Sequence, residues 1–173
     1  ADTMKRCTME LGGHSPVIVF DDADVEKALK VAAGFKYRNA GQGCISPTRF
    51  FIQDKAYKSF VDGFVERAQA IKVGNGMDDG VQMGPLIDAR RLPVMEDFVS
   101  DAQNHGANVV TGGERIGNQG YFYAPTVLSD VPDEAKIMND EPFGPIAPIT
   151  HFNTFDEVVE RANSLPFGLA SYV

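Results

Sequence analysis

The chain has 173 residues and a mass of 18.8 kDa, a length typical of one domain that buries its core without a metal or disulfide staple. Hydrophobic residues make up 43% of the sequence and charged residues 23%, which excludes a disordered chain. The net charge is −8 with no basic cluster, so nucleic acid and anionic membranes are poor partners. No apolar run approaches the ~20 residues of a membrane span.

The cysteines and histidines narrow the class of protein further. Two cysteines, Cys7 and Cys44, are too few for the disulfide framework of a small secreted domain, so we expect a reducing, cytoplasmic location. The three histidines stand far apart without metal-ligand spacing, and we expect no metal site: His14, His105 and His151.

In the first half of the chain, the hydrophobic pattern predicts two strands that are each followed by a helix. Apolar β-branched residues predict a strand at 16–20, and aspartates then begin a helix that continues to about residue 37. A second strand at 49–53 leads into the helix with the clearest apolar stripe, which Asp54 is expected to cap.

In the second half, a glycine-rich loop over 72–85 precedes a third helix, which Asp88 is expected to cap and which stops at Gly106. Thr154 and Glu157 form a capping box for a last helix. Strand-like runs lie at 108–111, 121–128 and 146–152.

This alternation predicts an α/β fold with a largely parallel twisted sheet and helices on both faces. The sequence ends at Tyr172 and Val173 in a strand-like stretch without a stop signal, so we expect a fragment of a larger protein.

Cys44 is the first candidate for chemistry. It lies in a glycine-rich turn between a predicted helix and strand, where a small neighbour, Gly43, lets a substrate approach. A thiolate attacks carbonyl carbon better than a hydroxyl does. From spacing alone, a half-buried free cysteine is the more common explanation.

Two glutamates stand beside residues that shape the backbone. Glu10 precedes a pair of glycines, where a carboxylate can swing and meet water as a general base requires, although most glutamates are solvated surface groups. Glu141 and Phe143 lie between two prolines and a glycine, which would hold them for a ligand or simply build a rigid corner. Arg38, near a helix end, would bind an anionic substrate or the carbonyl groups of that end.

Five motifs then stand in one order along the chain: Glu-Leu-Gly-Gly at 10–13, Asn-Ala-Gly-Gln-Gly-Cys at 39–44 with Arg49 beyond it, Gly-Pro-Leu-Ile at 84–87, Glu-Pro-Phe-Gly-Pro at 141–145 and Phe-Gly-Leu-Ala at 167–170. Together they resemble the catalytic domain of the NAD(P)-dependent aldehyde dehydrogenase superfamily over the whole chain. No Gly-x-Gly-x-x-Gly occurs, so the chain carries no Rossmann fingerprint of its own.

The resemblance implies a role for each candidate. The Cys44 thiolate would attack the aldehyde carbon, and water activated by Glu10 would hydrolyse the resulting thioester. The backbone N–H of Cys44 and an asparagine from an earlier segment, absent here, would hold the oxyanion. Glu141 matches the acid that binds the nicotinamide ribose, Phe143 matches the ring beside the nicotinamide, and the carbonyl of Leu11 would contact the carboxamide. The cofactor would be NAD or NADP.

The sequence around Arg38 resembles the succinate-semialdehyde dehydrogenase branch, in which an arginine at this position meets the substrate carboxylate. A guanidinium fork suits a carboxylate. Some members of the branch carry a second cysteine where this chain has Ser46, so a redox switch with Cys44 cannot form. Another ω-oxo acid, such as 2-oxoglutarate semialdehyde, stays open as the substrate.

The resemblance also implies what surrounds residues 1–173. We expect a catalytic domain fragment without its cofactor-binding domain and dimerisation hairpin, inactive alone and weakly self-associating, from a cytoplasmic homodimer or homotetramer. The expected partner is a small-molecule aldehyde, with no nucleic acid and no membrane. Two other classes remain: a cysteine hydrolase that pairs Cys44 with His14 or His151, and a non-catalytic module.

Overall fold

The computed structural model describes residues 3–173. In chain order its elements are β1 (Ser15–Val19), α1 (Val25–Lys36), the 3-10 helix η1 (Arg38–Gly41), β2 (Pro47–Gln53), α2 (Asp54–Gln69), α3 (Arg91–Asn104), β3 (Asn108–Thr111), β4 (Thr126–Ser129), α4 (Lys136–Asn139), β5 (Ile146–Phe152) and α5 (Phe155–Ala162). Among residues 3–173, no helix combines the length and the apolar character needed to cross a membrane.

The strands form one sheet in the order β1-β2-β5-β4-β3. The pairs β1–β2, β2–β5 and β4–β5 are parallel, and only β3 runs antiparallel to its neighbour β4. Beyond β1, Tyr172 continues the sheet with a parallel bridge to Val17. The expected α/β fold with a largely parallel sheet is therefore confirmed.

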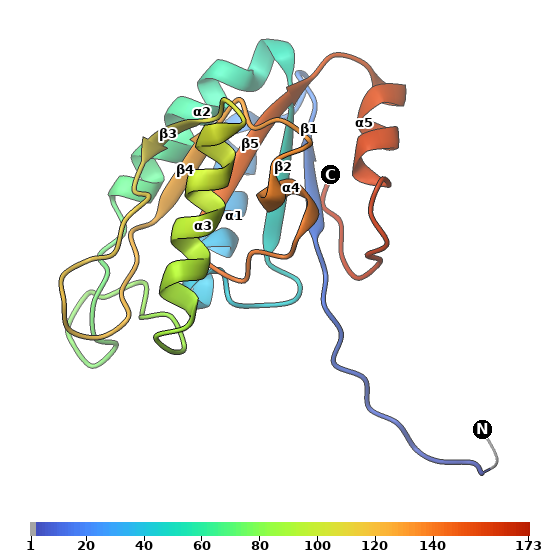
Figure 1. Cartoon of the computed structure of the whole chain (residues 1–173). Helices are drawn as coiled ribbons and strands as arrows, with labels where there is room; N and C mark the ends of the chain where they lie inside the picture. Colours follow the sequence, from blue (N-terminus) through green and yellow to red (C-terminus); the bar gives the residue numbers. More distant parts are fainter. Residues whose placement is uncertain (1–2) are drawn as a thin grey trace.

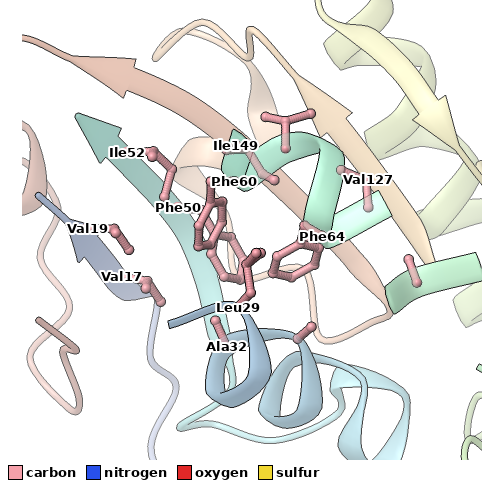
Figure 2. Close-up of a cluster of buried hydrophobic side chains, with 14 of the residues drawn as sticks. Val17, Val19, Leu29, Ala32, Phe50, Ile52, Phe60, Phe64, Val127 and Ile149 are labelled. Atoms are coloured by element: carbon pink, nitrogen blue, oxygen red, sulfur yellow. The ribbon is translucent and has the colours of Figure 1, made fainter. Parts of the chain in front are cut away.

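Helices cover both faces of the sheet (Figure 1). One core lies under α1 and α2, where Phe60 and Phe64 of α2 pack against Phe50 of β2 and Leu29 of α1 (Figure 2). A second core lies under α3, α4 and α5 on the opposite face. The interior strand β2 is buried on both faces, which explains its continuous apolar run of Phe50, Phe51 and Ile52.

Several local predictions were wrong at their boundaries. The strand expected over 121–128 begins only at Thr126, since the preceding Pro125 has no N–H to offer a neighbouring strand. Asp54 is the first residue of α2 and does not cap it. Asp88 accepts a hydrogen bond from the Arg90 backbone N–H at 2.9 Å, and α3 begins later, at Arg91.

The predicted start of the last helix was right in its main feature. Thr154 caps α5 by accepting a hydrogen bond from the Glu157 N–H at 3.3 Å. The Glu157 carboxylate reaches back to the N–H of Asn153 at 2.9 Å, one residue before the position expected in a capping box. Neither α4 nor η1 was expected from the sequence.

Candidate active site

Three of the five motifs come together where parallel strands begin. Gly13 lies shortly before β1, Cys44 shortly before β2, and Glu141 shortly before β5. Because β1, β2 and β5 are parallel neighbours, their amino ends lie at one edge of the sheet. The site is therefore built from connections that enter the sheet at this edge.

The glycine pair at 12–13 makes the closest contacts. The Gly13 N–H donates a hydrogen bond to Glu141 Oε1 at 3.1 Å. A Cβ atom on Gly13 would lie 2.5 Å from the carbonyl oxygen of Cys44, and one on Gly12 would lie 3.0 Å from Glu141 Oε2. Only glycine therefore allows this segment to lie between the cysteine turn and Glu141.

The turn that carries Cys44 has an unusual backbone. Asn39, Ala40 and Gly41 follow one another at φ values of 51°, 53° and 69°. The left-handed conformation costs roughly 1–2 kcal/mol per L-residue, so the surrounding structure must hold it. A Cβ on Gly41 would lie 2.2 Å from the Gly144 carbonyl oxygen, so this turn packs directly against the 141–145 corner. The Cys44 side chain itself is partly exposed, as a nucleophile requires.

Gln42 ties the cysteine turn to the motif at 84–87. Its Nε2 donates to the Pro85 carbonyl at 3.3 Å, and its Oε1 accepts from the Ile87 N–H at 2.8 Å. Gln42 is part of the motif at 39–44, and no role was predicted for it. Its side-chain amide offers both a donor and an acceptor, and this property could have indicated a role in joining two segments.

Two contacts join the fifth motif and the chain end to the same place. Leu169 lies against Gly13, 3.2 Å from the position of an added Cβ. The Tyr172 hydroxyl donates to the carbonyl of Ile45, next to Cys44, at 2.7 Å. Burial, and to a smaller extent Cys44, raise the pKa of Tyr172. All five motifs thus converge on the Cys44 turn, whereas no sequence pattern indicated the contact made by Tyr172.

Glu141 is half-buried, and burial raises the pKa of its carboxyl group, against the opposing effects of the Gly13 N–H and Arg91. Its Oε1 is engaged by Gly13, whereas Oε2 has no hydrogen-bond partner among residues 3–173. Phe143 has a φ of 43° and an exposed ring. This corner therefore presents a carboxylate oxygen and an aromatic face side by side.

Glu10 and Leu11 lie on an extended, exposed segment that leads away from the body of the molecule (Figure 1). No hydrogen bond within residues 3–173 joins either of them to the Cys44 turn. They are connected to the site along the chain, through Gly12, and their roles stay predictions.

Arg38 begins η1 with an exposed side chain. It lines a hollow of about 460 Å³ between α1 and α2, together with Lys30, Gly34 and Arg67, and Cys44 does not line this hollow. The structure therefore does not bring Arg38 and Cys44 into one pocket, and substrate binding by Arg38 stays a prediction.

The histidines bear on the cysteine hydrolase alternative. The buried His14 ring is hydrogen-bonded to Thr48 Oγ1 at 2.8 Å and to the Ile137 carbonyl at 3.1 Å. Since a carbonyl only accepts, Nε2 carries the proton, and Nδ1 is left to accept from the Thr48 hydroxyl. Burial first, then the charges of Arg49 and Lys36, lower the pKa of His14 to about 3.

His14 is thus a neutral structural hydrogen-bonding group, and both of its nitrogens are occupied. His151 pairs with Asp54 at 3.3 Å near the opposite, carboxyl end of β5. Neither histidine is hydrogen-bonded to Cys44, so the hydrolase alternative lacks the base that it needs. Within residues 3–173, no three His, Cys, Asp or Glu side chains gather as metal ligands would.

Comparison with known proteins agrees with this geometry. Residues 1–173 match the model of the aldehyde dehydrogenase family. The chain is 45% identical to the 3-sulfolactaldehyde dehydrogenase of Pseudomonas putida over 99% of its length and 35% of that relative. It is 42% identical to the NADP(+) succinate-semialdehyde dehydrogenase of Escherichia coli K12 over 99% of its length and 36% of that relative.

Solved structures show the same relationship. The succinate-semialdehyde dehydrogenase from Burkholderia pseudomallei superposes with a TM-score of 0.93 at 41% identity, covering 95% of this chain and 34% of that one. The chain spans about a third of the length of the relatives that it matches. It belongs to the aldehyde dehydrogenase family.

Proposed function

We propose that the protein carrying this chain oxidises an aldehyde to a carboxylic acid with NAD(P), using Cys44 as the nucleophile. The observation that supports this most strongly is the convergence of all five motifs on the Cys44 turn, through contacts of Gly13, Gln42, Gly144 and Leu169. A merely structural cysteine would not need a strained turn packed between a carboxylate corner and a glycine pair.

The reaction at Cys44 proceeds in two stages, oxidation of the bound aldehyde to a thioester and hydrolysis of that thioester. The thiolate adds to the aldehyde carbon, a C–S bond forms, and the oxygen takes the electron pair, held by the Cys44 backbone N–H. When bound, oxidised NAD(P) supplies the hydride acceptor. Loss of hydride from the former aldehyde carbon leaves a thioester on Cys44. Glu10 then takes a proton from water as it attacks, and the C–S bond breaks to release the acid and the thiolate.

The residues present fit the nicotinamide end of such a cofactor. Glu141 Oε2 is available to accept from a ribose hydroxyl because Gly13 already holds Oε1. The exposed ring of Phe143 offers a face to the nicotinamide, and the carbonyl of Leu11 would accept from the carboxamide. The preference between NAD and NADP is measured by the assay described below.

For the substrate, we propose an aldehyde with an anionic end group, with succinate semialdehyde as the first compound to test. Three relatives at 42–45% identity are named for 3-sulfolactaldehyde, succinate semialdehyde and glutarate semialdehyde. Each name denotes an aldehyde with a sulfonate or carboxylate group. Arg38, with a free guanidinium fork, would bind this group, and 2-oxoglutarate semialdehyde is the alternative substrate.

The test compares the complete gene product with Cys44→Ala, Arg38→Met and Lys30→Met. Each is offered succinate semialdehyde, 2-oxoglutarate semialdehyde and an uncharged aldehyde of equal length, with NAD and NADP in turn. We expect Cys44→Ala to lose at least about 10³-fold in kcat with every substrate.

We expect Arg38→Met to raise KM about 10- to 100-fold for the anionic aldehydes only, the effect of one lost charge-assisted interaction. Lys30→Met removes a charge from the same hollow and should act like the wild type. Full activity in Cys44→Ala would overturn the proposed reaction. Equal effects of Arg38→Met on charged and uncharged aldehydes would overturn only the role of Arg38.

A further inference from the structure

The corner at 141–145 is held in a conformation that it would not keep by itself. Phe143 has a φ of 43°, which is unfavourable for a residue with a bulky side chain. Gly144 packs so closely against α3 that an added Cβ would lie 2.1 Å from Met95 Sδ. The backbone on either side of Phe143 therefore needs an external support.

Arg91, the first residue of α3, supplies this support. Its Nη2 donates to the Pro142 carbonyl and, at 3.3 Å, to the Phe143 carbonyl. The side chain is half-buried, and burial lowers the pKa of Arg91 against the opposing charges of Asp88 and Glu141. One guanidinium thus engages the carbonyls of the two peptide links on either side of the strained residue Phe143.

The neighbouring arginine shows that this contact is specific. Arg90 points to solvent with 90% of its side chain exposed, and its carboxylate partner is Asp88, two residues away. Of these two adjacent arginines, Arg91 contacts the 141–145 corner, whereas Arg90 is exposed and contacts Asp88.

We propose that Arg91 is a positioning residue for the cofactor: its guanidinium holds the backbone of the 141–145 corner so that Glu141 and Phe143 face the nicotinamide end. This inference rests on the proposed function, because it takes Glu141 and Phe143 as the groups that meet the cofactor. Arg91 itself acts through the two carbonyls and needs no contact with substrate or cofactor.

The test uses the complete gene product with Arg91→Met, Arg91→Lys and the matched control Arg90→Met. Three quantities are measured: the Kd of NADH and NADPH by fluorescence, the Cys44-dependent hydrolysis of an activated ester without cofactor, and amide hydrogen exchange at Phe143 and Gly144 without cofactor. Ester cleavage needs acyl transfer to Cys44 and hydrolysis of the thioester but no hydride acceptor, so it reports on the site chemistry without the cofactor.

We expect Arg91→Met to weaken cofactor binding about 10- to 100-fold, because small displacements of positioning groups have effects of this size. Amide exchange at Phe143 and Gly144 should become at least about 10-fold faster, while ester hydrolysis stays within about twofold. Arg91→Lys keeps the charge but loses the planar fork, and it should recover part of the affinity. Arg90→Met should match the wild type in all three measurements.

Cofactor affinity in Arg91→Met within about twofold of the wild type would overturn the inference, as would unchanged amide exchange at the corner. Simultaneous loss of ester hydrolysis would also overturn it, since Arg91 would then support the whole site and not the corner. Failure of the proposed function would give a different result, because Cys44→Ala would then keep its dehydrogenase activity. Amide hydrogen exchange at Phe143 and Gly144 would still show whether Arg91 holds the corner.

Discussion

The ammonium group of Lys36 is buried away from solvent. Its side chain is fully buried at the end of α1, and Nζ has no hydrogen-bond partner among residues 3–173. Burial lowers the pKa of Lys36 from 10.5 to about 7. Between these two values the unfolded chain binds a proton that the folded chain does not, so this residue makes stability rise with pH across that range.

We therefore predict that Lys36→Met stabilises the chain by about 2–4 kcal/mol near neutral pH, since a methionine of similar length avoids the desolvation cost. The gain should fall by more than half at about pH 9.5, where the folded wild type has lost the proton and most of the penalty. Urea unfolding of both proteins at the two pH values measures this. Equal gains at both would contradict the assigned titration.

At the same scale, the glycines and prolines of the motifs predicted a turn at Cys44 and a rigid corner at Glu141 and Phe143, while the roles of these three side chains stay predictions. The sequence was a poor guide to Tyr172 and Arg91. Their roles depend on hydrogen bonds to the carbonyls of Ile45, Pro142 and Phe143, far away in the sequence. A backbone carbonyl is common to every residue type, so no sequence pattern marks such a partner.

Among the elements, the 3-10 helix before Cys44 makes the strictest demand on residue type. Gly41 combines a φ of 69° with an approach that leaves no room for a Cβ beside the Gly144 carbonyl. We predict that Gly41→Ala destabilises the chain by about 2–3 kcal/mol. The Cys44 thiol should also lose the reactivity that it has in the native turn.

The control for this prediction is Gly34→Ala, in the last turn of α1, where nothing lies within 4 Å of an added Cβ. It should stabilise the helix by about 0.5–1 kcal/mol and leave the thiol unchanged. Thermal unfolding and the rate of alkylation of Cys44 measure both effects. A Gly41→Ala protein with wild-type stability would show that the close approach to Gly144 is relaxed in solution.

The element boundaries that were predicted well depend on local chemistry. β5 spans 146–152 as expected, and Thr154 caps α5 through its own hydroxyl. The 3-10 helix that was missed depends on distant partners. The left-handed run at Asn39 and Ala40 would be unfavourable in an isolated peptide, and contacts with the 141–145 corner hold it in place.

Over the whole molecule, Arg49 links segments that are more than a hundred residues apart. Its buried guanidinium donates to the carbonyls of His14 at 3.1 Å, Arg161 at 3.2 Å and Ala162 at 2.9 Å. Burial lowers the pKa of Arg49 to about 10, so the group stays charged at neutral pH. It holds the end of α5 against the segment that enters β1.

We predict that Arg49→Gln destabilises the chain by about 3 kcal/mol, because a glutamine amide cannot reach three carbonyls and leaves buried acceptors unpaired. Limited proteolysis should then cut within 163–171 faster than in the wild type. Arg90→Gln, on the exposed surface, should change neither quantity. Unaltered cleavage in Arg49→Gln would mean that other contacts hold this segment.

The sequence predicted the fold class from the alternation of strands and helices, but not the strand order β1-β2-β5-β4-β3 or the direction of β3. Strand order depends on which long connections cross which face, and every parallel arrangement of these strands would show the same apolar pattern. The meeting of Gly13, Cys44 and Glu141 at one edge follows from that order, so only the structure could reveal it.

The reversed direction of β3 has an electrostatic consequence at the sheet edge where Cys44 lies. Helices that join parallel strands end at the edge where Cys44 lies, and α1 accordingly brings its carboxyl end there. Because β3 runs the other way, α3 before it is also reversed and brings its amino end to the 141–145 corner. A helix carries about half a positive charge at its amino end and half a negative charge at its carboxyl end. Because of the single reversed edge strand, the partial positive charge of the α3 amino end lies beside the corner that carries the Glu141 carboxylate, at the same edge of the sheet as the carboxyl end of α1.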